Sequence, residues 1–262
     1  MNTLLFDAGN TRFKWALLRG DRLGAQRAAP VGDLDAFAAW LERAPPIWRI
    51  VGVSAAGPPL ERALRALLRR AERPAPDLLV ASRQAAGIHN SYQEPARLGA
   101  DRWAAMTAAW HLAGRRRHVC AVSIGTATTI DLVDAQGRHR GGLIAPGPAL
   151  MLDALLGRTA DLASRAALDS RQRVRASGAV IRPLAASTRA GIDAGCLMAA
   201  AGLVERTVAE LSRSIGRRPA VYLTGGGSDA VAPLLHGATR LVPDLVLRGV
   251  AALAELPIRR RA

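Results

Sequence analysis

The sequence predicts an α/β protein built from two lobes with a cleft between them. A short apolar stretch, a turn that contains glycine and a second apolar stretch open the chain, and the same succession returns after Gly114–Arg117. Helical periodicity follows each copy, which indicates a duplicated unit of strands and helices. Two such lobes facing each other leave a cleft with one glycine-rich hairpin on each side.

The first lobe is expected over residues 1–115. Its apolar runs read as buried strands, and Leu34, Phe37 and Leu41 fall on one face of a helix that Asp33 is placed to cap. Pro58 and Pro59 suit the first turn of a helix with leucines inward and arginines outward. The expected strands are Thr3–Phe6, Phe13–Leu18, Ile47–Val53 and Leu78–Ala81, and a further helix runs from near Gly99 to about Ala113.

The second lobe is expected over residues 116–262. The strand–turn–strand pattern returns there with Gly125-Thr126-Ala127-Thr128 as the turn, and Pro146-Gly147-Pro148 ends a third strand. The expected strands are Val119–Ile124, Thr129–Val133, Gly141–Ala145 and Val221–Thr224, with helices around 149–157 and 184–213.

The composition is that of a globular protein with a hydrophobic core. Half of the 262 residues are hydrophobic and 22% are charged, and no apolar run is long enough to cross a bilayer. The N-terminal sequence MNTLLFDAGN has no signal-peptide pattern, so we expect a cytoplasmic protein without membrane attachment. Two cysteines and the absence of a Cys-x-x-Cys motif argue against a disulfide scaffold and structural zinc.

The net charge of +15 raises the question of nucleic-acid binding. Of the 36 basic residues only Lys14 is a lysine, and the densest runs, Arg115–Arg117 and Arg259–Arg261, do not alternate with aromatic residues. An arginine-rich, lysine-poor chain is typical of a GC-rich genome. We therefore do not expect nucleic acid as a partner, and a basic surface equally attracts anionic small molecules such as nucleotides.

The first turn, Asp7-Ala8-Gly9-Asn10-Thr11, has the chemistry of a phosphate-binding hairpin. Glycine lets the backbone approach a phosphate closely, and its N–H groups and the hydroxyl donate to oxygens. Asp7 is placed to hold Mg²⁺ directly or through water, and Lys14 to reach the β- and γ-phosphates. The alternative is a tight turn without function; the second copy of the pattern, which ends in Asp131, favours the phosphate reading.

Two other nucleotide motifs fit less well. A P-loop needs Gly-Lys before Ser or Thr, and the only lysine of this chain follows Phe13. Gly225-x-Gly227-x-x-Ala230 matches the loose dinucleotide pattern but leaves little chain for the rest of a dinucleotide fold. A glycine-rich turn that packs against the base or ribose of a nucleotide is the simpler interpretation.

A third candidate site ends at the start of a helix. Gly99-Ala100-Asp101-Arg102 places an acid beside a base directly after a glycine. Asp101 at a helix N-terminus would in any case be favoured by the macrodipole, with Arg102 in solvent. The functional interpretation is a substrate site in which Asp101 accepts a hydroxyl proton and Arg102 pairs with a carboxylate.

Taken in order, these motifs resemble those of type III pantothenate kinases, within the superfamily of acetate kinase, sugar kinases, Hsp70 and actin. That superfamily has duplicated ribonuclease H-like lobes. The family also includes proteins named Bvg accessory factors, which are linked to transcriptional regulation. The resemblance rests on the Asp7 hairpin with Lys14, the segment from Tyr92 to Arg102, Gly125–Asp131, Gly141–Gly147, Ser187–Ile192 and Leu223–Gly226.

The resemblance implies ATP-dependent phosphorylation of pantothenate to 4'-phosphopantothenate, the first step of coenzyme A biosynthesis, with Mg²⁺ as the metal and a homodimer as the assembly. By position Asp101 matches the catalytic base of the family. The matched ATP and phosphate contacts are Asp7, Ala8, Gly9, Asn10, Thr11, Arg12, Phe13, Lys14 and Thr126, with Asp7 also at the metal, and the matched pantothenate contacts are Tyr92, Gly99, Ala100, Arg102 and Thr188.

One position departs from the family pattern. Many members carry Asp two residues before the second Gly-Thr pair, where it binds potassium or ammonium, and this chain has Ser123 there. A neutral hydroxyl is a poorer cation ligand than a carboxylate, so we expect little dependence on a monovalent cation. Two alternatives remain at this point: another small-molecule kinase of the superfamily, and a transcriptional accessory protein that acts by protein or nucleic-acid contact with a vestigial kinase site.

Overall fold

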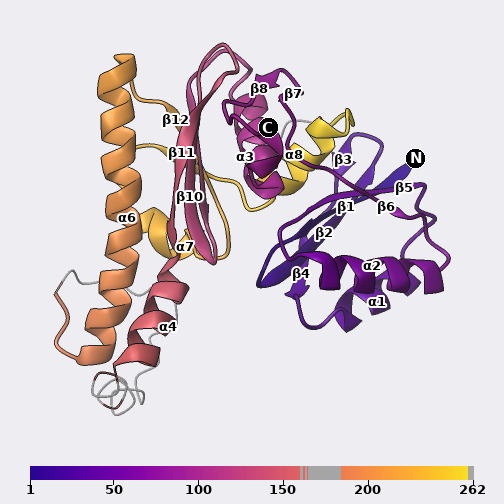
Figure 1. The fold of residues 1–262 in the computed structure, drawn as a ribbon, viewed down its shortest axis with the longest axis horizontal. Helices are drawn as coiled ribbons and strands as arrows, with labels where there is room; N and C mark the ends of the chain where they lie inside the picture. The colour runs from indigo at the N-terminus through magenta and orange to yellow at the C-terminus, as the bar shows by residue number, and fades with distance from the viewer. Residues whose placement is uncertain (160–161, 163, 165–183, 259–262) are drawn as a thin grey trace. The chain divides into compact units, whose positions relative to one another are not determined.

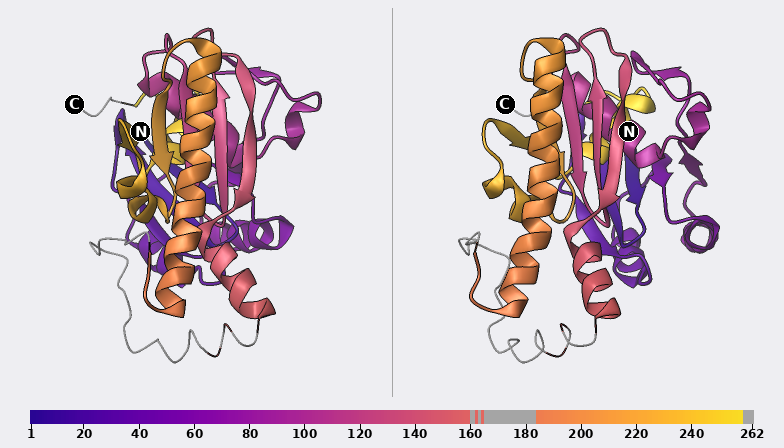
Figure 2. Two further views of the ribbon diagram at one scale, coloured as in Figure 1. Left: turned by 90° about the vertical axis from the view of Figure 1, so that its left-hand side faces the viewer. Right: turned by 60° about the vertical axis from the view of Figure 1, so that its left-hand side comes forward.

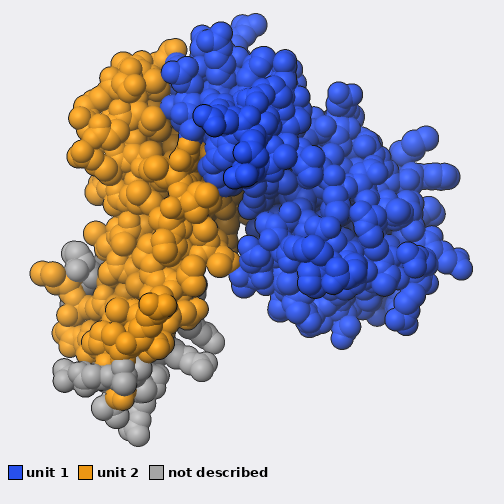
Figure 3. All heavy atoms as spheres, in the orientation of Figure 1, with its two compact units in different colours: residues 1–119, 132–141, 244–262 blue, residues 120–131, 142–243 orange. Residues whose placement is uncertain are grey.

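The computed structural model describes residues 1–159, 162, 164 and 184–258. The chain divides into two compact units (Figure 3): unit 1 comprises Met1–Val119, Leu132–Gly141 and Asp244–Ala262, and unit 2 comprises Cys120–Asp131 and Gly142–Pro243. The lobe boundary between residues 115 and 116 stays a prediction. The arginine run Arg259–Arg261 lies outside the described residues.

Unit 1 is built on a six-stranded sheet in the order β3-β2-β1-β5-β6, with β4 also paired to β2. The central hairpin pairs β1 with β2 in antiparallel register, and β5 continues the sheet parallel to β1. The hairpin confirms the first predicted strand–turn–strand. The strands are β1 Asn2–Ala8, β2 Arg12–Arg19, β3 Arg22–Leu23, β4 Arg27–Pro30, β5 Arg49–Ser54 and β6 Pro76–Leu78, and the short hairpin of β7 Gln84–Ala85 and β8 Ile88–His89 stands apart.

Helices α1 (Asp35–Glu42) and α2 (Pro58–Arg70) supply one side of the core of unit 1 (Figure 1). Phe37 of α1 packs edge-on against Phe13, with ring centroids 4.9 Å apart, and aromatic pairs of this kind stabilise a core by about 0.5–1.5 kcal/mol. Leu64 and Leu68 of α2 belong to the same cluster, as the leucine spacing predicts. Asp33 accepts a hydrogen bond from the backbone N–H of Asp35 at 3.0 Å, although the N-cap position itself is occupied by Leu34.

Helices α3 (Ala100–Leu112) and α8 (Leu245–Leu253) pack against each other and against β5. The close approach depends on Gly249, where a Cβ atom would run into the backbone of Ala104. Helix α3 agrees with the predicted helix near Gly99. Sequence analysis missed α8, because the seven residues from Leu245 to Ala251 are all buried and leave no polar face.

Unit 2 contains most of a five-stranded sheet in the order β11-β10-β9-β12-β13. Helix α6 (Thr188–Ile215) covers one face of this sheet, where its Val204 and Val208 meet Val122 and Leu223 (Figure 2). The remaining elements are β9 Val119–Ile124, β10 Ala127–Val133, β11 His139–Pro146, β12 Ala220–Thr224, β13 Thr239–Leu241, α4 Pro148–Arg158, which packs on α6, and the short α7 Ser228–Val231.

Most of the predicted strands and helices are confirmed, and one strand was misplaced. The strand predicted at Leu78–Ala81 lies earlier, at Pro76–Leu78, where it pairs parallel to β5. None of the helices in the described part of the chain combines the length and apolar character needed to span a bilayer.

Candidate active site

The β1–β2 hairpin places Asp7 and Lys14 opposite each other. They are register partners in the antiparallel pair, and the Lys14 ammonium lies 3.5 Å from the Asp7 carboxylate. The turn is closed by the backbone N–H of Gly9, which donates to the carbonyl of Arg12 at 3.1 Å. Asn10, Thr11 and Arg12 are exposed at the turn, as a phosphate-binding loop requires, whereas the side chains of Ala8 and Phe13 are buried in the core.

Asp7 is a buried carboxylate with incomplete charge compensation. Its residue is only 5% exposed, and burial raises its pKa from 3.8 to about 6. Lys14 acts in the opposite direction and lowers this pKa, while the negative charge of Asp101 raises it further. The first hairpin and the first turn of α3 are therefore brought together inside unit 1, where the carboxylates of Asp7 and Asp101 repel each other.

This arrangement fits a nucleotide-bound Mg²⁺ ion. Mg²⁺ prefers carboxylate oxygens and keeps several waters and phosphate oxygens as its remaining ligands. Within the described ranges, no group of three or more His, Cys, Asp or Glu side chains is arranged to hold a metal ion. A cation at Asp7 would thus complete its shell with water and phosphate, which is the usual arrangement for Mg²⁺ with a nucleotide.

Asp101 lies in the first turn of α3 and is oriented by its neighbours. Its Oδ1 accepts a hydrogen bond from the backbone N–H of Arg102 at 2.9 Å. Gly99, the N-cap residue, leaves the room for this orientation, because a Cβ there would lie 2.8 Å from Oδ1. The glycine predicted as a substrate contact therefore also has a steric reason to be glycine.

Arg102 and Tyr92, both predicted as substrate contacts, are in direct contact. Arg102 Nη1 donates to the Tyr92 hydroxyl at 3.1 Å, and its guanidinium carbon lies 5.9 Å from the centre of the Tyr92 ring. Arg102 is 7% exposed, so it is not the solvated arginine of the alternative interpretation. The loop that carries Tyr92 is held in place by Arg83, whose guanidinium donates to the carbonyl groups of Tyr92 and Gln93, both at 2.7 Å.

His139 is the member of this group that sequence analysis missed. It is 2% exposed and its ring stacks on Tyr92, with centroids 5.9 Å apart and ring planes at 24°. Its Nδ1 lies 3.2 Å from the Ser91 hydroxyl, so Ser91, His139, Tyr92 and Arg102 form a continuous row. No sequence pattern links His139 to Tyr92, because His139 lies on β11, far along the chain from Tyr92.

The second predicted hairpin lies in unit 2 together with two glycine turns. Gly125 donates to the carbonyl of Ala127 at 3.0 Å, and Gly147 donates to the carbonyl of Thr126 at 2.8 Å. Gly225 has φ of +102° and lies so close to Ile124 that a Cβ atom would meet its carbonyl, while Gly227 donates to that carbonyl at 2.9 Å. The turns after β9, β11 and β12 are thus in contact, which only residues without side chains allow.

The remaining predicted residues also belong to unit 2. Thr126 is exposed at the hairpin, Ser123 is half-buried on β9, and Thr188 begins α6 after the N-cap Ser187, whose hydroxyl accepts from the N–H of Ala190 at 3.3 Å. Helix α7 after Gly227 has four residues, too few for the helix of a dinucleotide-binding unit. The exclusion of that motif is consistent with this geometry.

Comparison with known proteins decides the family. A family model described as type III pantothenate kinase matches residues 3–210. The chain belongs to the type III pantothenate kinase family. A type III pantothenate kinase from Verminephrobacter eiseniae is 37% identical and covers 100% of this chain and 99% of its own length. One from Azoarcus sp. is 38% identical, covering 96% of this chain and 90% of its own.

Solved structures confirm the fold class. A putative 2-dehydro-3-deoxygalactonokinase from Sinorhizobium meliloti shares 17% sequence identity at a TM-score of 0.52, over 99% of this chain and 98% of its own. A likeness at this identity concerns the fold. The similarity extends over nearly the whole of both chains and agrees with the predicted α/β fold class.

Proposed function

We propose that this chain transfers the γ-phosphoryl group of ATP to the primary hydroxyl of pantothenate and so forms 4'-phosphopantothenate, the first step of coenzyme A biosynthesis. The observation that carries the proposal is the grouping of Asp7, Lys14 and Asp101 in unit 1 of a chain that belongs to the type III pantothenate kinase family. The carboxylate of Asp101 at the start of α3 therefore interacts electrostatically with Asp7 of the phosphate hairpin.

The phosphate side of the proposed site is the β1–β2 hairpin. Backbone N–H groups of its exposed turn and the Lys14 ammonium would hold the nucleotide phosphates, and Asp7 would hold the Mg²⁺ that accompanies them. Bound there, Mg²⁺ supplies charge neutralisation, which together with positioning dominates phosphoryl transfer. Thr126 at the second hairpin is proposed as a further phosphate contact.

The acceptor side is the segment from Tyr92 to Arg102. Asp101, held by the Arg102 backbone N–H, would orient the attacking hydroxyl and take its proton, a contribution worth typically about 10²–10⁴ in rate. The Arg102 guanidinium would pair with the pantothenate carboxylate, with Tyr92 holding it in place. Gly99, Ala100 and Thr188 are proposed as additional contacts with pantothenate.

We also propose that the enzyme is a homodimer. Strand β11 forms an edge of its sheet and carries Leu143 and Ile144, which are 45% and 64% exposed. Helix α4, which follows it directly, exposes Leu150 and Leu155. Exposed apolar side chains on consecutive elements are typical of an interface between subunits.

A cytoplasmic location completes the proposal, and it is supported by the two cysteines. Cys120 and Cys196 are both free thiols, which suits a reducing compartment. A strong requirement for potassium or ammonium is not proposed, because Ser123 offers only a hydroxyl where many relatives carry a carboxylate.

The decisive experiment is a coupled kinase assay with purified protein, ATP and Mg²⁺. Pantothenate is tested beside a panel of sugars and small carboxylic acids, with product identity checked by mass spectrometry. Formation of phosphopantothenate, without phosphorylation of the other acceptors, supports the proposal. Turnover of another acceptor without pantothenate would instead indicate a different small-molecule kinase of the superfamily, and folded protein without any turnover would reject the proposal. No observation favours the transcriptional alternative.

A further inference from the structure

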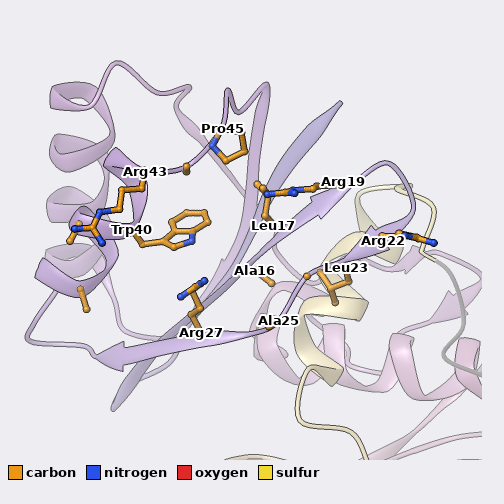
Figure 4. A pocket seen from close by; sticks show the side chains of 14 residues that line it. Ala16, Leu17, Arg19, Arg22, Leu23, Ala25, Arg27, Trp40, Arg43 and Pro45 are labelled. Carbon is orange, nitrogen blue, oxygen red and sulfur yellow. The ribbon is translucent and has the colours of Figure 1, made fainter.

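A cavity lies in unit 1, between helix α1 and the strands β2 to β4 (Figure 4). Its volume is about 750 Å³, which is within the usual range of small-molecule sites. Its walls come from the end of β2, the β3 hairpin, β4, helix α1 and the residues that follow this helix. None of these residues takes part in the function proposed above.

The charge of this cavity is of one sign. Its lining includes Arg19, Arg22, Arg27 and Arg43 and contains no aspartate or glutamate. Figure 4 shows Arg19 extending from β2 toward Trp40, Arg27 directed at Trp40 from β4, and Arg22 at the outer side of the hairpin. Guanidinium groups are the side chains best suited to hold phosphate oxygens through paired hydrogen bonds.

Some arginines of this chain have a carboxylate partner, whereas the four arginines of the cavity have none among the described residues. Arg49, Arg97 and Arg206 each have a carboxylate partner within 3.0 Å. Within the ranges that the structure describes, no ion pair joins a carboxylate to any of the four arginines of the cavity. Arg62 and Arg65 in the described part of the chain likewise have no ion pair, so the distinguishing feature of the four arginines is that they line one cavity, where a single anionic ligand would compensate their charges together.

Trp40 gives the cavity an aromatic wall. Its ring stacks on Phe37, with centroids 5.9 Å apart and planes at 19°, and Trp15 adjoins it at 6.0 Å. Packing against two buried aromatic residues fixes the indole in place. A fixed indole beside guanidinium groups suits a ligand that carries both phosphates and a planar base.

We propose that this cavity is a second, non-catalytic binding site for a linear oligophosphate, either that of a nucleoside triphosphate or inorganic. Each phosphoryl group carries about one to two negative charges at neutral pH, so a triphosphate matches the charge of three or four arginines. The volume of about 750 Å³ is suited to one such molecule.

The cavity is distinct from the candidate active site. Arg19 is the register partner of Asn2, whereas Lys14 is the partner of Asp7. Five residues of strand separate these two pairs, which corresponds to about 17 Å along the sheet. Arg27 lies nearer to the hairpin, because its register partner Trp15 is the neighbour of Lys14. Successive side chains of a strand point to opposite faces of the sheet, so Lys14 lies on the face opposite to Trp15, which packs against Trp40 of the cavity. One nucleotide bound at Lys14 therefore does not also fill the cavity.

The test uses tripolyphosphate and ATP, each without Mg²⁺ or pantothenate, and measures hydrogen exchange of peptides from residues 16–45 and, separately, from the Asp7 hairpin. The variants are Arg19→Gln/Arg27→Gln and, as a control that removes two equal charges, Arg62→Gln/Arg65→Gln on the exposed face of α2. Arg43→Gln serves if the first pair does not fold. Circular dichroism and the kinase rate should be unchanged in every variant.

We expect tripolyphosphate to protect residues 16–45, with affinity at least about tenfold weaker in Arg19→Gln/Arg27→Gln and unchanged in the control. If ATP binds more tightly than tripolyphosphate and Trp40→Leu abolishes this difference, the occupant is a nucleotide. If ATP and tripolyphosphate bind equally well, the occupant is an inorganic oligophosphate. Equal weakening in the two double variants would overturn the proposal, because binding would then follow only net charge. Absence of protection of residues 16–45 by both tripolyphosphate and ATP would overturn it as well.

Discussion

The burial of Asp7 predicts that Asp7→Asn makes the protein more stable while it destroys the activity. Burial raises the pKa of this carboxyl from 3.8 to about 6. A shift of roughly two units corresponds to about 3 kcal/mol of unfavourable free energy for the ionised form in the folded protein. An uncharged side chain of nearly the same shape does not incur this cost.

The net gain is smaller than that figure, because an amide does not fully replace a protonated carboxyl group. The favourable effect of Lys14, whose ammonium lies 3.5 Å from Asp7, is already included in the raised pKa and is not subtracted again. The new amide group must also find hydrogen bonds. We therefore expect the free energy of unfolding to rise by about 1–2 kcal/mol at pH 7.5, or about 2–8 °C in Tm for a chain of this size.

The pH dependence distinguishes this cause from other stabilising effects. Between pH 4 and pH 6 the folded protein retains a proton on Asp7 that the unfolded chain releases, so the contribution of Asp7 to stability falls as the pH rises through this window. The advantage of Asp7→Asn should accordingly shrink by about 1–2 kcal/mol between pH 7.5 and pH 5.

The measurement is urea unfolding of both proteins at several pH values, without nucleotide or Mg²⁺. Asp77→Asn is the matched control, because Asp77 is an exposed carboxylate in an ion pair with Arg49 at 3.0 Å. It should change stability by less than about 1 kcal/mol and gain nothing at high pH. An Asp7→Asn protein that is less stable than the parent at pH 7.5, or that shows the same pH profile, would refute the reasoning.

Four further predictions concern separate residues. Asp101→Asn should lower kcat about 10²–10⁴-fold while pantothenate binding is retained. Arg102→Ala should raise KM for pantothenate about 10–100-fold with a smaller effect on kcat. Equal loss of pantothenate binding in the two variants would show that Asp101 and Arg102 act as one unit. His139→Leu should raise KM for pantothenate more than it lowers kcat, and an unchanged KM would limit His139 to a packing role. Because of Ser123, potassium titrated against tetramethylammonium should activate the enzyme weakly, and strong saturable activation would contradict the ligand argument. Gly249→Ala should destabilise the fold by more than about 2 kcal/mol in urea unfolding, because its Cβ would meet the backbone of Ala104, and a neutral effect would show that α3 and α8 can separate freely.

The parts of the fold that the sequence predicts are those set by local pattern. The hairpin of β1 and β2 follows from two apolar runs around a glycine turn, and α2 follows from leucines that all face one side. Helix α8 could not be found in this way. Its burial on every side, and the requirement for Gly249, come from packing against α3, which lies more than a hundred residues earlier.

For the candidate site, the residue types could be predicted from the sequence, but their spatial arrangement could not. The sequence identifies Asp7, Lys14, Asp101 and Arg102 as chemically suited residues, but it contains no information on their distances. Only the folded chain shows that Asp101 raises the pKa of Asp7, or that His139 supports Tyr92 from another strand. These relations join segments far apart in sequence, and neither periodicity nor motif spacing encodes them.

The chain is strongly basic, yet the buried end of its phosphate hairpin holds more carboxylates than ammonium groups. The protein carries +15 overall, which favours the approach of anionic substrates from solution. At the hairpin, however, Asp7 and Asp101 place two carboxylates against the single ammonium of Lys14. A phosphate that arrives alone would meet repulsion there, whereas a nucleotide that brings a divalent cation would relieve the repulsion between the carboxylates. The instability that Asp7 introduces without substrate is, by this argument, the source of its selectivity for a metal-bound nucleotide.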